Sequence, residues 1–133
     1  MRAFMVGGKP RITSAAKGLK EWRALVAVTA QEQSKMWTVS PTESVGMSLT
    51  FYLPRPKGHY GKNGILPSAP KSPTKKPDLD KLIRAVGDAL VPTLLHDDNQ
   101  VTFIVASKAY ADEAEPPGVL VSLFPYPAEE DDS

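Results

Sequence analysis

The chain of 133 residues contains no cysteine, so it has no disulfide framework, no thiolate metal site and no cysteine nucleophile. It also lacks any apolar run near the roughly 18 residues that a membrane span needs, and Met1 to Thr13 has no apolar signal segment. We therefore expect a cytoplasmic protein. With 41% hydrophobic residues the chain has enough for one domain with one core, which excludes a multidomain machine.

Charge of one sign is missing from two stretches. Residues 55–76 contain no Asp or Glu, and residues 109–133 contain no Lys or Arg. The formal net charge of +1 therefore averages a basic first part, up to Lys76, and an acidic end. Such segregation is a hint of nucleic-acid binding. We expect one domain over residues 1–126, followed by an acidic, disordered tail over residues 127–133.

Apolar periodicity predicts two helices. Leu19 to Gln33 repeats apolar residues at helical spacing, with Ser14 as a candidate cap one turn earlier. Pro77 to Leu90 carries a second apolar stripe, and its polar side presents Asp80, Arg84 and Asp88 at i, i+4 and i+8. Both helices need a partner layer to cover the apolar stripe.

Strand patterns supply that layer. Strict alternation predicts a strand with one buried face over Val45 to Leu53, and Val101 to Ala106 is an apolar, β-branched run that predicts a buried strand. Val119 to Phe124 is the last strand, and Ala3 to Val6 is a weaker candidate. The order of elements indicates an α+β domain with one small mixed β-sheet and two main helices against it.

Between the first long strand and the second helix, residues 55–76 are rich in Pro and Gly, which predicts a long, mobile loop. Such loops are often functional. The loop carries six bases that should grip DNA phosphates through charge, namely Arg55, Lys57, Lys62, Lys71, Lys75 and Lys76.

Two pairs of acids stand near the second helix. Asp78 and Asp80 open it, and Asp97 and Asp98 lead into the next strand. Each alone is an ordinary helix-capping or turn residue. If that strand lies beside the helix start, three carboxylates converge and need a hard cation such as Mg²⁺, which supports phosphodiester hydrolysis beside a basic loop. From the residues alone, the structural and the catalytic interpretation both stay open.

The segments Phe51–Tyr60, Lys76–Leu90 and Asp97–Val101 resemble the RusA family of Holliday junction resolvases. The family signature is Lys-Pro-Asp-x-Asp-Asn-Leu at a helix start, a basic residue one turn on, Asp-Ala-Leu at the helix end, and Asp-Asp-x-Gln-[Ile/Val] at a strand start. The likeness covers about residues 2–124 and is strongest over residues 51–108. It implies a homodimeric, Mg²⁺-dependent endodeoxyribonuclease that cuts four-way DNA junctions by paired nicks in recombination and repair, with Mn²⁺ as the alternative ion. Family members tend to carry a strand and a Pro-rich stretch ahead of the part resembling Arg2 to Arg11, which leaves a start at an internal methionine open.

Carried over residue by residue, the resemblance implies that Asp78, Asp80 and Asp98 are the metal ligands. The family's usual lysine one turn on is Arg84 here, which stays charged and can steady phosphate charge but is a poor proton donor. The usual asparagine after the acidic pair is Lys81, which we add to the DNA-binding set. Asp88 matches the Asp-Ala-Leu, and we expect it to pair with Arg84 on the helix surface.

Three further residues are interpreted as structural rather than functional. His96 adjoins the second acidic pair, and we expect it to face solvent rather than act as a base or ligand. Trp22 and Trp37 are expected to pack in or beside the core rather than stack on bases.

Two alternative functions stay open: a non-cleaving, structure-specific DNA-binding protein, and a metal-dependent nuclease that acts on other branched DNA.

Overall fold

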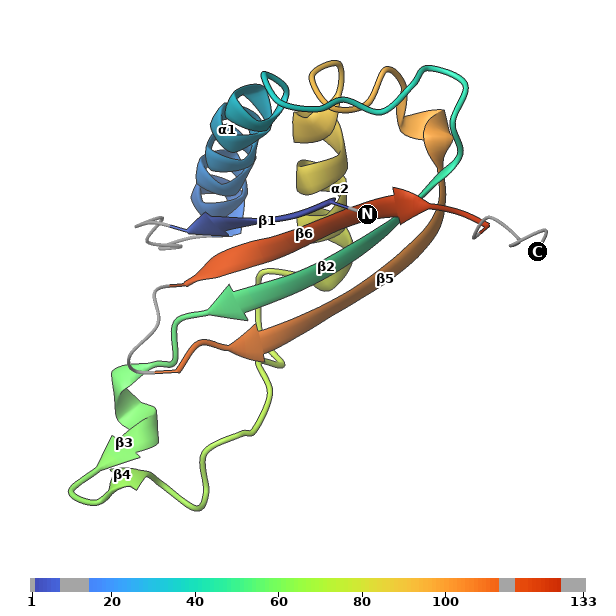
Figure 1. The fold of residues 1–133 in the computed structure, drawn as a ribbon. Helices are drawn as coiled ribbons and strands as arrows, with labels where there is room; N and C mark the ends of the chain where they lie inside the picture. The colour runs from blue at the N-terminus through green and yellow to red at the C-terminus, as the bar shows by residue number, and fades with distance from the viewer. Residues whose placement is uncertain (1, 8–14, 113–116, 128–133) are drawn as a thin grey trace.

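The computed structural model describes residues 2–7, 15–112 and 117–127 (Figure 1). Ser14 and residues 128–133 of the acidic tail lie outside these ranges. The elements in chain order are β1 (Arg2–Gly7), α1 (Ala15–Gln33), β2 (Val45–Leu53), the 3₁₀ helix η1 (Lys57–His59), β3 (Tyr60–Gly61), β4 (Gly64–Ile65), α2 (Leu79–Leu90), the 3₁₀ helix η2 (Asp98–Gln100), β5 (Val101–Tyr110) and β6 (Gly118–Pro125). Within the described residues, no helix is long and apolar enough to cross a membrane.

One mixed sheet forms the centre of the fold, with the strand order β1-β6-β2-β5. β6 pairs antiparallel with both β1 and β2, whereas β2 and β5 run parallel, from Val45 opposite Val101 to Leu53 opposite Tyr110. β3 and β4 form a separate small hairpin. This is the predicted α+β architecture, with a small mixed sheet and two main helices.

Both helices lie side by side on one face of the sheet (Figure 1). The core forms where their apolar stripes meet alternate residues of β2. Trp22 of α1, 1% exposed, packs edge-on against Phe51 of β2 with ring centroids 6.2 Å apart. Trp37 packs against Phe4, as expected of a core-flanking residue. The buried layer includes Trp22, Val26, Ala30, Met47, Leu49, Phe51, Leu82, Val86 and Leu90.

The prediction that residues 101–106 form a buried strand is wrong in one respect. The strand exists and is longer, but it lies at the edge of the sheet, and Phe103, Ile104 and Val105 are exposed. An apolar, β-branched run predicts a strand equally well whether or not other parts of the chain cover it. The sequence pattern therefore predicted the strand but not its position in the sheet.

The segment between β2 and α2 is not featureless. It contains η1 and the β3–β4 hairpin, which extend beyond the end of the sheet (Figure 1). Gly64 at the hairpin turn has φ +104°, a conformation that favours glycine. The predicted long loop over residues 55–76 thus contains local structure of its own, while its mobility stays a prediction.

Candidate functional site

The two acidic pairs lie at opposite ends of α2. Asp78 is the N-cap residue of this helix and Asp80 lies in its first turn, whereas Asp97 and Asp98 follow its far end. A helix of 12 residues is about 18 Å long. Figure 1 shows η2 at the start of β5, away from the first turn of α2. Among the described residues, no three His, Asp or Glu side chains gather in a group that could hold a metal ion. The condition for convergence, a strand start beside the helix start, is not met within one chain.

The first acidic pair sits among positive charges. Asp78 makes no side-chain capping hydrogen bond, and its carboxylate lies 3.6 Å from the ammonium of Lys81. Asp80 lines a hollow of about 240 Å³ with Arg23, Lys81 and Arg84. Arg23 comes from α1 and was missed by sequence reasoning, because helical spacing places it on a polar face without saying which neighbour that face meets. The first turn of α2 thus offers carboxylates beside three bases from two helices.

In the second acidic pair, only Asp97 caps the turn. Asp97 accepts the backbone N–H of Asn99 at 2.9 Å, and its partner in the capping box is Gln100. The Asn99 amide, and secondly the Asp98 side chain, hold the pKa of Asp97 below its usual value. Asp98 has no part in the capping box. Of this pair, Asp98 is therefore the better candidate for binding a ligand, as the resemblance implied.

Gln100 fixes this turn to the rest of the fold. Its side chain is buried, and its Oε1 accepts the backbone N–H groups of His96 and Asp97 at 2.9 and 3.1 Å. Its Nε2 donates to the carbonyl oxygens of Ser40 and Glu43 at 2.7 and 3.0 Å. Sequence reasoning did not single out Gln100, although it belongs to the matched Asp-Asp-x-Gln signature.

A hollow of about 310 Å³ lies beside Asp98, and Asp88 and His96 also line it. Asp88 therefore belongs to the far end of α2 together with the second acidic pair. The expected ion pair between Asp88 and Arg84 is absent, since the described residues form a single ion pair, Lys81 with Asp78. His96 is exposed, in agreement with the sequence interpretation.

The predicted DNA-binding bases separate into one anchored residue and several free ones. The guanidinium of Arg55 lies 4.1 Å above the ring of Tyr110 and donates to the carbonyl oxygen of Pro70 at 2.8 Å. It is also 3.3 Å from Nδ1 of His59, so it links the start of the segment to Pro70 further along. The remaining bases are exposed: Lys57, Lys62, Lys71, Lys75, Lys76 and Lys81.

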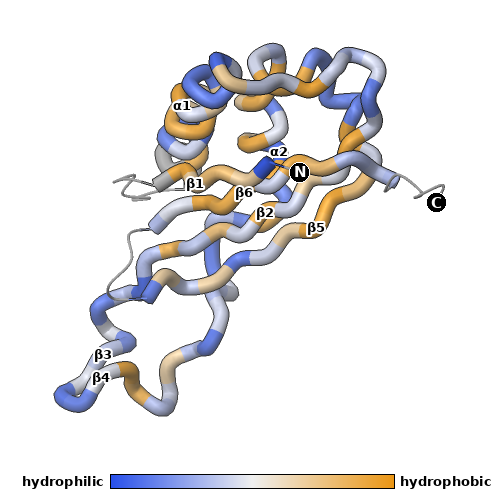
Figure 2. The backbone as a smooth tube through the Cα atoms, in the orientation of Figure 1, coloured by the Kyte–Doolittle hydropathy of each residue, from blue (hydrophilic) through white to orange (hydrophobic). Residues whose placement is uncertain are grey.

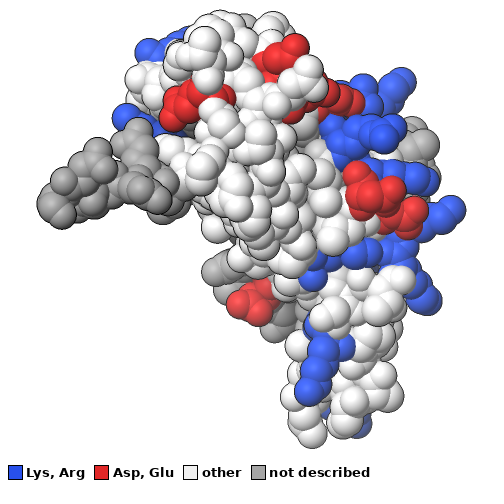
Figure 3. Space-filling model, turned by 90° about the vertical axis from the view of Figure 1, so that its right-hand side faces the viewer, with Lys and Arg blue, Asp and Glu red and all other residues white. Residues whose placement is uncertain are grey.

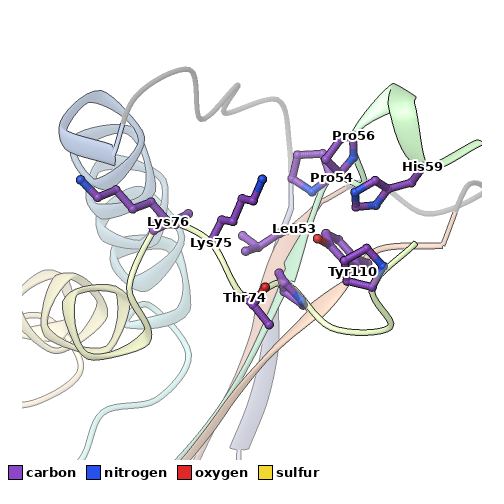
Figure 4. Close-up of a pocket in the computed structure, with 11 residues that line it drawn as sticks. Leu53, Pro54, Pro56, His59, Thr74, Lys75, Lys76 and Tyr110 are labelled. Carbon is purple, nitrogen blue, oxygen red and sulfur yellow. The ribbon is translucent and has the colours of Figure 1, made fainter. Parts of the chain in front are cut away.

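A pocket of about 480 Å³ opens between this segment and the sheet. His59 and Tyr110 stand on one side of it, and Lys75 and Lys76 extend from the chain leading into α2 on the other (Figure 4). Most of its remaining wall is proline. An apolar pocket with two ammonium groups at its border suits a group with a flat apolar part and a negative charge.

Many of the Lys and Arg side chains gather on one side of the molecule. Figure 3 shows Lys and Arg side chains along one side of the molecule, with a small group of acids among them, while much of the rest of that view is uncharged. A surface of this kind attracts a polyanion by its bases and presents carboxylates to it.

Fold and site together define an α+β domain whose aspartates stand beside exposed bases, a chemical combination suited to phosphodiesters. Comparison with known families agrees. The family model described as "Endodeoxyribonuclease RusA" matches residues 3–123. The chain therefore belongs to the RusA endodeoxyribonuclease family. It is also 31% identical over 115 residues to "Uncharacterized protein YqaN" of Bacillus subtilis (strain 168), an alignment that covers 84% of this chain and 79% of YqaN.

Proposed function

We propose that this protein is a Mg²⁺-dependent endodeoxyribonuclease that resolves Holliday junctions by paired symmetric nicks in DNA recombination and repair. Family membership supports nuclease activity. The observation that carries the finer proposal is the pair of aspartates at the first turn of α2, surrounded by Arg23, Lys81 and Arg84. Carboxylates bind the metal, and the bases draw in the phosphate that is to be cut.

Asp78 and Asp80 fit a magnesium site by donor chemistry. Both are exposed carboxylates, neither is used in a helix cap, and Mg²⁺ binds one or two carboxylates while keeping waters and phosphate oxygens. When bound, the ion lowers the pKa of a water and neutralises the leaving oxygen. Asp98 is the third proposed ligand. Because it lies at the far end of α2, we propose that it joins the first pair from a second copy of the chain in a homodimer.

In this proposal Arg84 stabilises the negative charge of the phosphate. It lies one turn after Asp80 on the same hollow. An arginine side chain can stabilise negative charge on the scissile phosphate but is a poor proton donor to the leaving oxygen. The proton on that oxygen then has to come from another donor, such as solvent or the Lys81 ammonium in the same hollow.

The exposed lysines of the segment before α2 bind the DNA backbone. Lys71, Lys75 and Lys76 are all exposed and lead directly to Asp78, so duplex phosphates held there lie next to the carboxylates. Contacts of this type position DNA without reading its sequence. Arg55 supports them indirectly by holding the segment in place.

One observation favours a second candidate, a non-cleaving protein that binds branched DNA. The Lys81 ammonium lies 3.6 Å from the Asp78 carboxylate, at the position where the family usually has asparagine. An ammonium at that distance competes with a metal ion for the carboxylate. The pair is half exposed, 55% and 50%, so solvent weakens this competition.

The test is to incubate the purified protein with Mg²⁺ and four-way, forked and linear DNA of matched sequence. We expect symmetric nicks in the four-way junction and little cutting of linear duplex. Cutting of forks at an equal rate would favour the broader nuclease activity. Tight junction binding with no cutting in Mg²⁺ or Mn²⁺ would favour the binding protein, and Lys81→Asn would then be expected to restore cleavage.

A further inference from the structure

A pocket of about 480 Å³ borders the chain that leads into α2, and the cleavage step proposed above does not use it. The rings of His59 and Tyr110 form one side, and Leu53 lies between them and Lys75 (Figure 4). Prolines complete most of the wall: Pro54, Pro56, Pro70, Pro73 and Pro77. Pockets of this volume with apolar and aromatic walls typically bind small organic groups.

Hydrogen bonds from charged side chains hold the walls of this pocket in place. The Nζ of Lys108, on β5, donates to the carbonyl oxygens of Lys75 and Pro77, each at 3.1 Å. Arg55 donates to the carbonyl oxygen of Pro70 at 2.8 Å. Figure 2 shows hydrophobic colour mainly near β4 along the stretch from β4 to α2, so few apolar side chains are available there to fill the space. The pocket is therefore formed before a ligand arrives, which lowers the entropy cost of binding.

The border of the pocket is positively charged. Lys75 and Lys76 are exposed, and neither ammonium group pairs with a carboxylate among the described residues. Pro77 lines the pocket and is followed directly by Asp78, the N-cap residue of α2. A ligand with a flat apolar ring and a phosphate therefore meets both complementary surfaces here, next to the first acidic pair.

We propose that this pocket binds one unstacked nucleobase of branched DNA while Lys75 holds the phosphate of the same nucleotide, a proposal that rests on the nuclease function proposed above. Every base offers a flat π face to aromatic and apolar side chains, so this contact does not depend on the sequence. Because Asp78 directly follows the Pro77 wall, the captured nucleotide lies beside the phosphodiester at the first turn of α2. The base thereby fixes which phosphate faces the carboxylates.

A base pocket provides a means of selecting branched DNA. In a paired duplex, a base must be unpaired and unstacked before it can enter a pocket, and this cost is least where the base has no partner. The exposed lysines, by contrast, contact phosphates that every DNA shape presents. We therefore assign the affinity for DNA to the lysines, and the preference for disrupted pairing to the pocket.

Binding to DNA with one unpaired nucleotide tests the pocket without any cleavage. In EDTA, wild type should bind a duplex with a single unpaired thymine roughly tenfold more tightly than the fully paired duplex with the same flanking sequence. Thr74 is exposed and lines the pocket, so Thr74→Trp should fill it and abolish this preference while the affinity for paired duplex is kept. Ser72→Trp is the matched control, because Ser72 is exposed on the same stretch outside the pocket lining, and it should keep the preference. Equal affinity of wild type for both duplexes, or a preference that survives Thr74→Trp, would overturn the proposal.

Fluorescence quenching reports where the unpaired base lies. A fluorescent adenine analogue in place of the unpaired thymine should be protected from acrylamide in complexes with wild type and Ser72→Trp, but as accessible as in free DNA with Thr74→Trp. Equal quenching in free DNA and in the wild-type complex would overturn the pocket assignment. Micromolar binding of thymidine monophosphate without a preference for unpaired DNA would also overturn it, because the ligand would then be a free nucleotide.

The binding experiments separate the pocket from the nuclease proposal, since they are made in EDTA. A chain that captures the unpaired base but cuts no DNA in Mg²⁺ keeps the pocket and loses the nuclease function. A chain that cuts junctions but shows no preference for the unpaired base gives the reverse.

Discussion

Asp97 and Gln100 cap the same turn from opposite sides. Gln100 Oε1 accepts the backbone N–H of Asp97 at 3.1 Å, while the Asp97 side chain accepts the N–H of Asn99 at 2.9 Å. Asp78, by contrast, occupies an N-cap position and makes no side-chain cap. The capping interpretation therefore applies to Asp97, the acid that family resemblance did not name as a ligand, and not to Asp78.

The first prediction follows from the low pKa of Asp97, which the Asn99 amide and then the Asp98 side chain cause. Since its folded pKa is depressed, its contribution to stability is present above the unfolded value of about 3.9 and is lost as the pH falls through the folded value. Asp97→Ala should therefore melt below wild type at pH 7, with the difference shrinking toward pH 3. Melting curves across this range measure it, and a difference that grows on acidification would contradict the assignment.

The second prediction concerns Gln100. Gln100→Ala should destabilise the fold by about 1 to 3 kcal/mol, because the buried Gln100 side chain makes partly buried hydrogen bonds to the carbonyl oxygens of Ser40 and Glu43 that the variant loses. Urea unfolding measures the loss. Asn99→Ala is the control: its side chain is exposed and its backbone N–H, which remains, makes the bond to Asp97. Equal stability of both variants would show that the Gln100 bonds are not needed.

The third prediction concerns the exposed lysines before α2. Replacing Lys71, Lys75 and Lys76 together by Ala should weaken binding to every DNA shape and flatten the slope of log affinity against log salt by roughly 0.9 per lost contact. Fluorescence anisotropy over a salt series measures both. Lys35→Ala, equally exposed but just after α1, should leave the slope unchanged. An unaltered slope in the triple variant would mean that these lysines do not touch phosphate.

The fourth prediction separates the charge of Arg55 from its anchoring role. Arg55→Lys keeps the charge but loses the planar contact with Tyr110 and the fixed bond to the Pro70 carbonyl. The segment should become more sensitive to limited proteolysis, while Lys57→Ala should not change its cleavage. Should Arg55→Lys resist protease as well as wild type, Arg55 would be a phosphate contact rather than an anchor.

Most of the fold was predictable from local pattern. Alternation over residues 45–53 gave β2 with its observed bounds, and the apolar stripes gave both helices, although α1 begins at Ala15 rather than Leu19. These patterns need only one face to be buried, which the chain itself supplies. The place of β5 at the sheet edge was not predictable, because strand order depends on contacts distant in sequence.

The resemblance named Asp78, Asp80 and Asp98 as ligands, and this role stays a prediction. The sequence already predicted a helix between the first two and the third, but it left open whether the following strand starts beside the helix start, which it does not do in the described part of the chain. Arg23 was missed because it comes from α1, where no motif marks it. Gln100 was missed because the sequence does not show that this side chain is buried or that it makes four hydrogen bonds.

The measurement that tests the account most directly compares Asp98→Asn with wild type for junction cleavage and junction binding in Mg²⁺. The substitution removes the charge of one proposed ligand and nearly preserves shape, so cleavage should fall by orders of magnitude while affinity is kept or rises. Asp78→Asn and Asp80→Asn should behave alike, and Asp97→Asn should show a smaller defect. A folded Asp98→Asn protein that cuts junctions at the wild-type rate would contradict the proposed site.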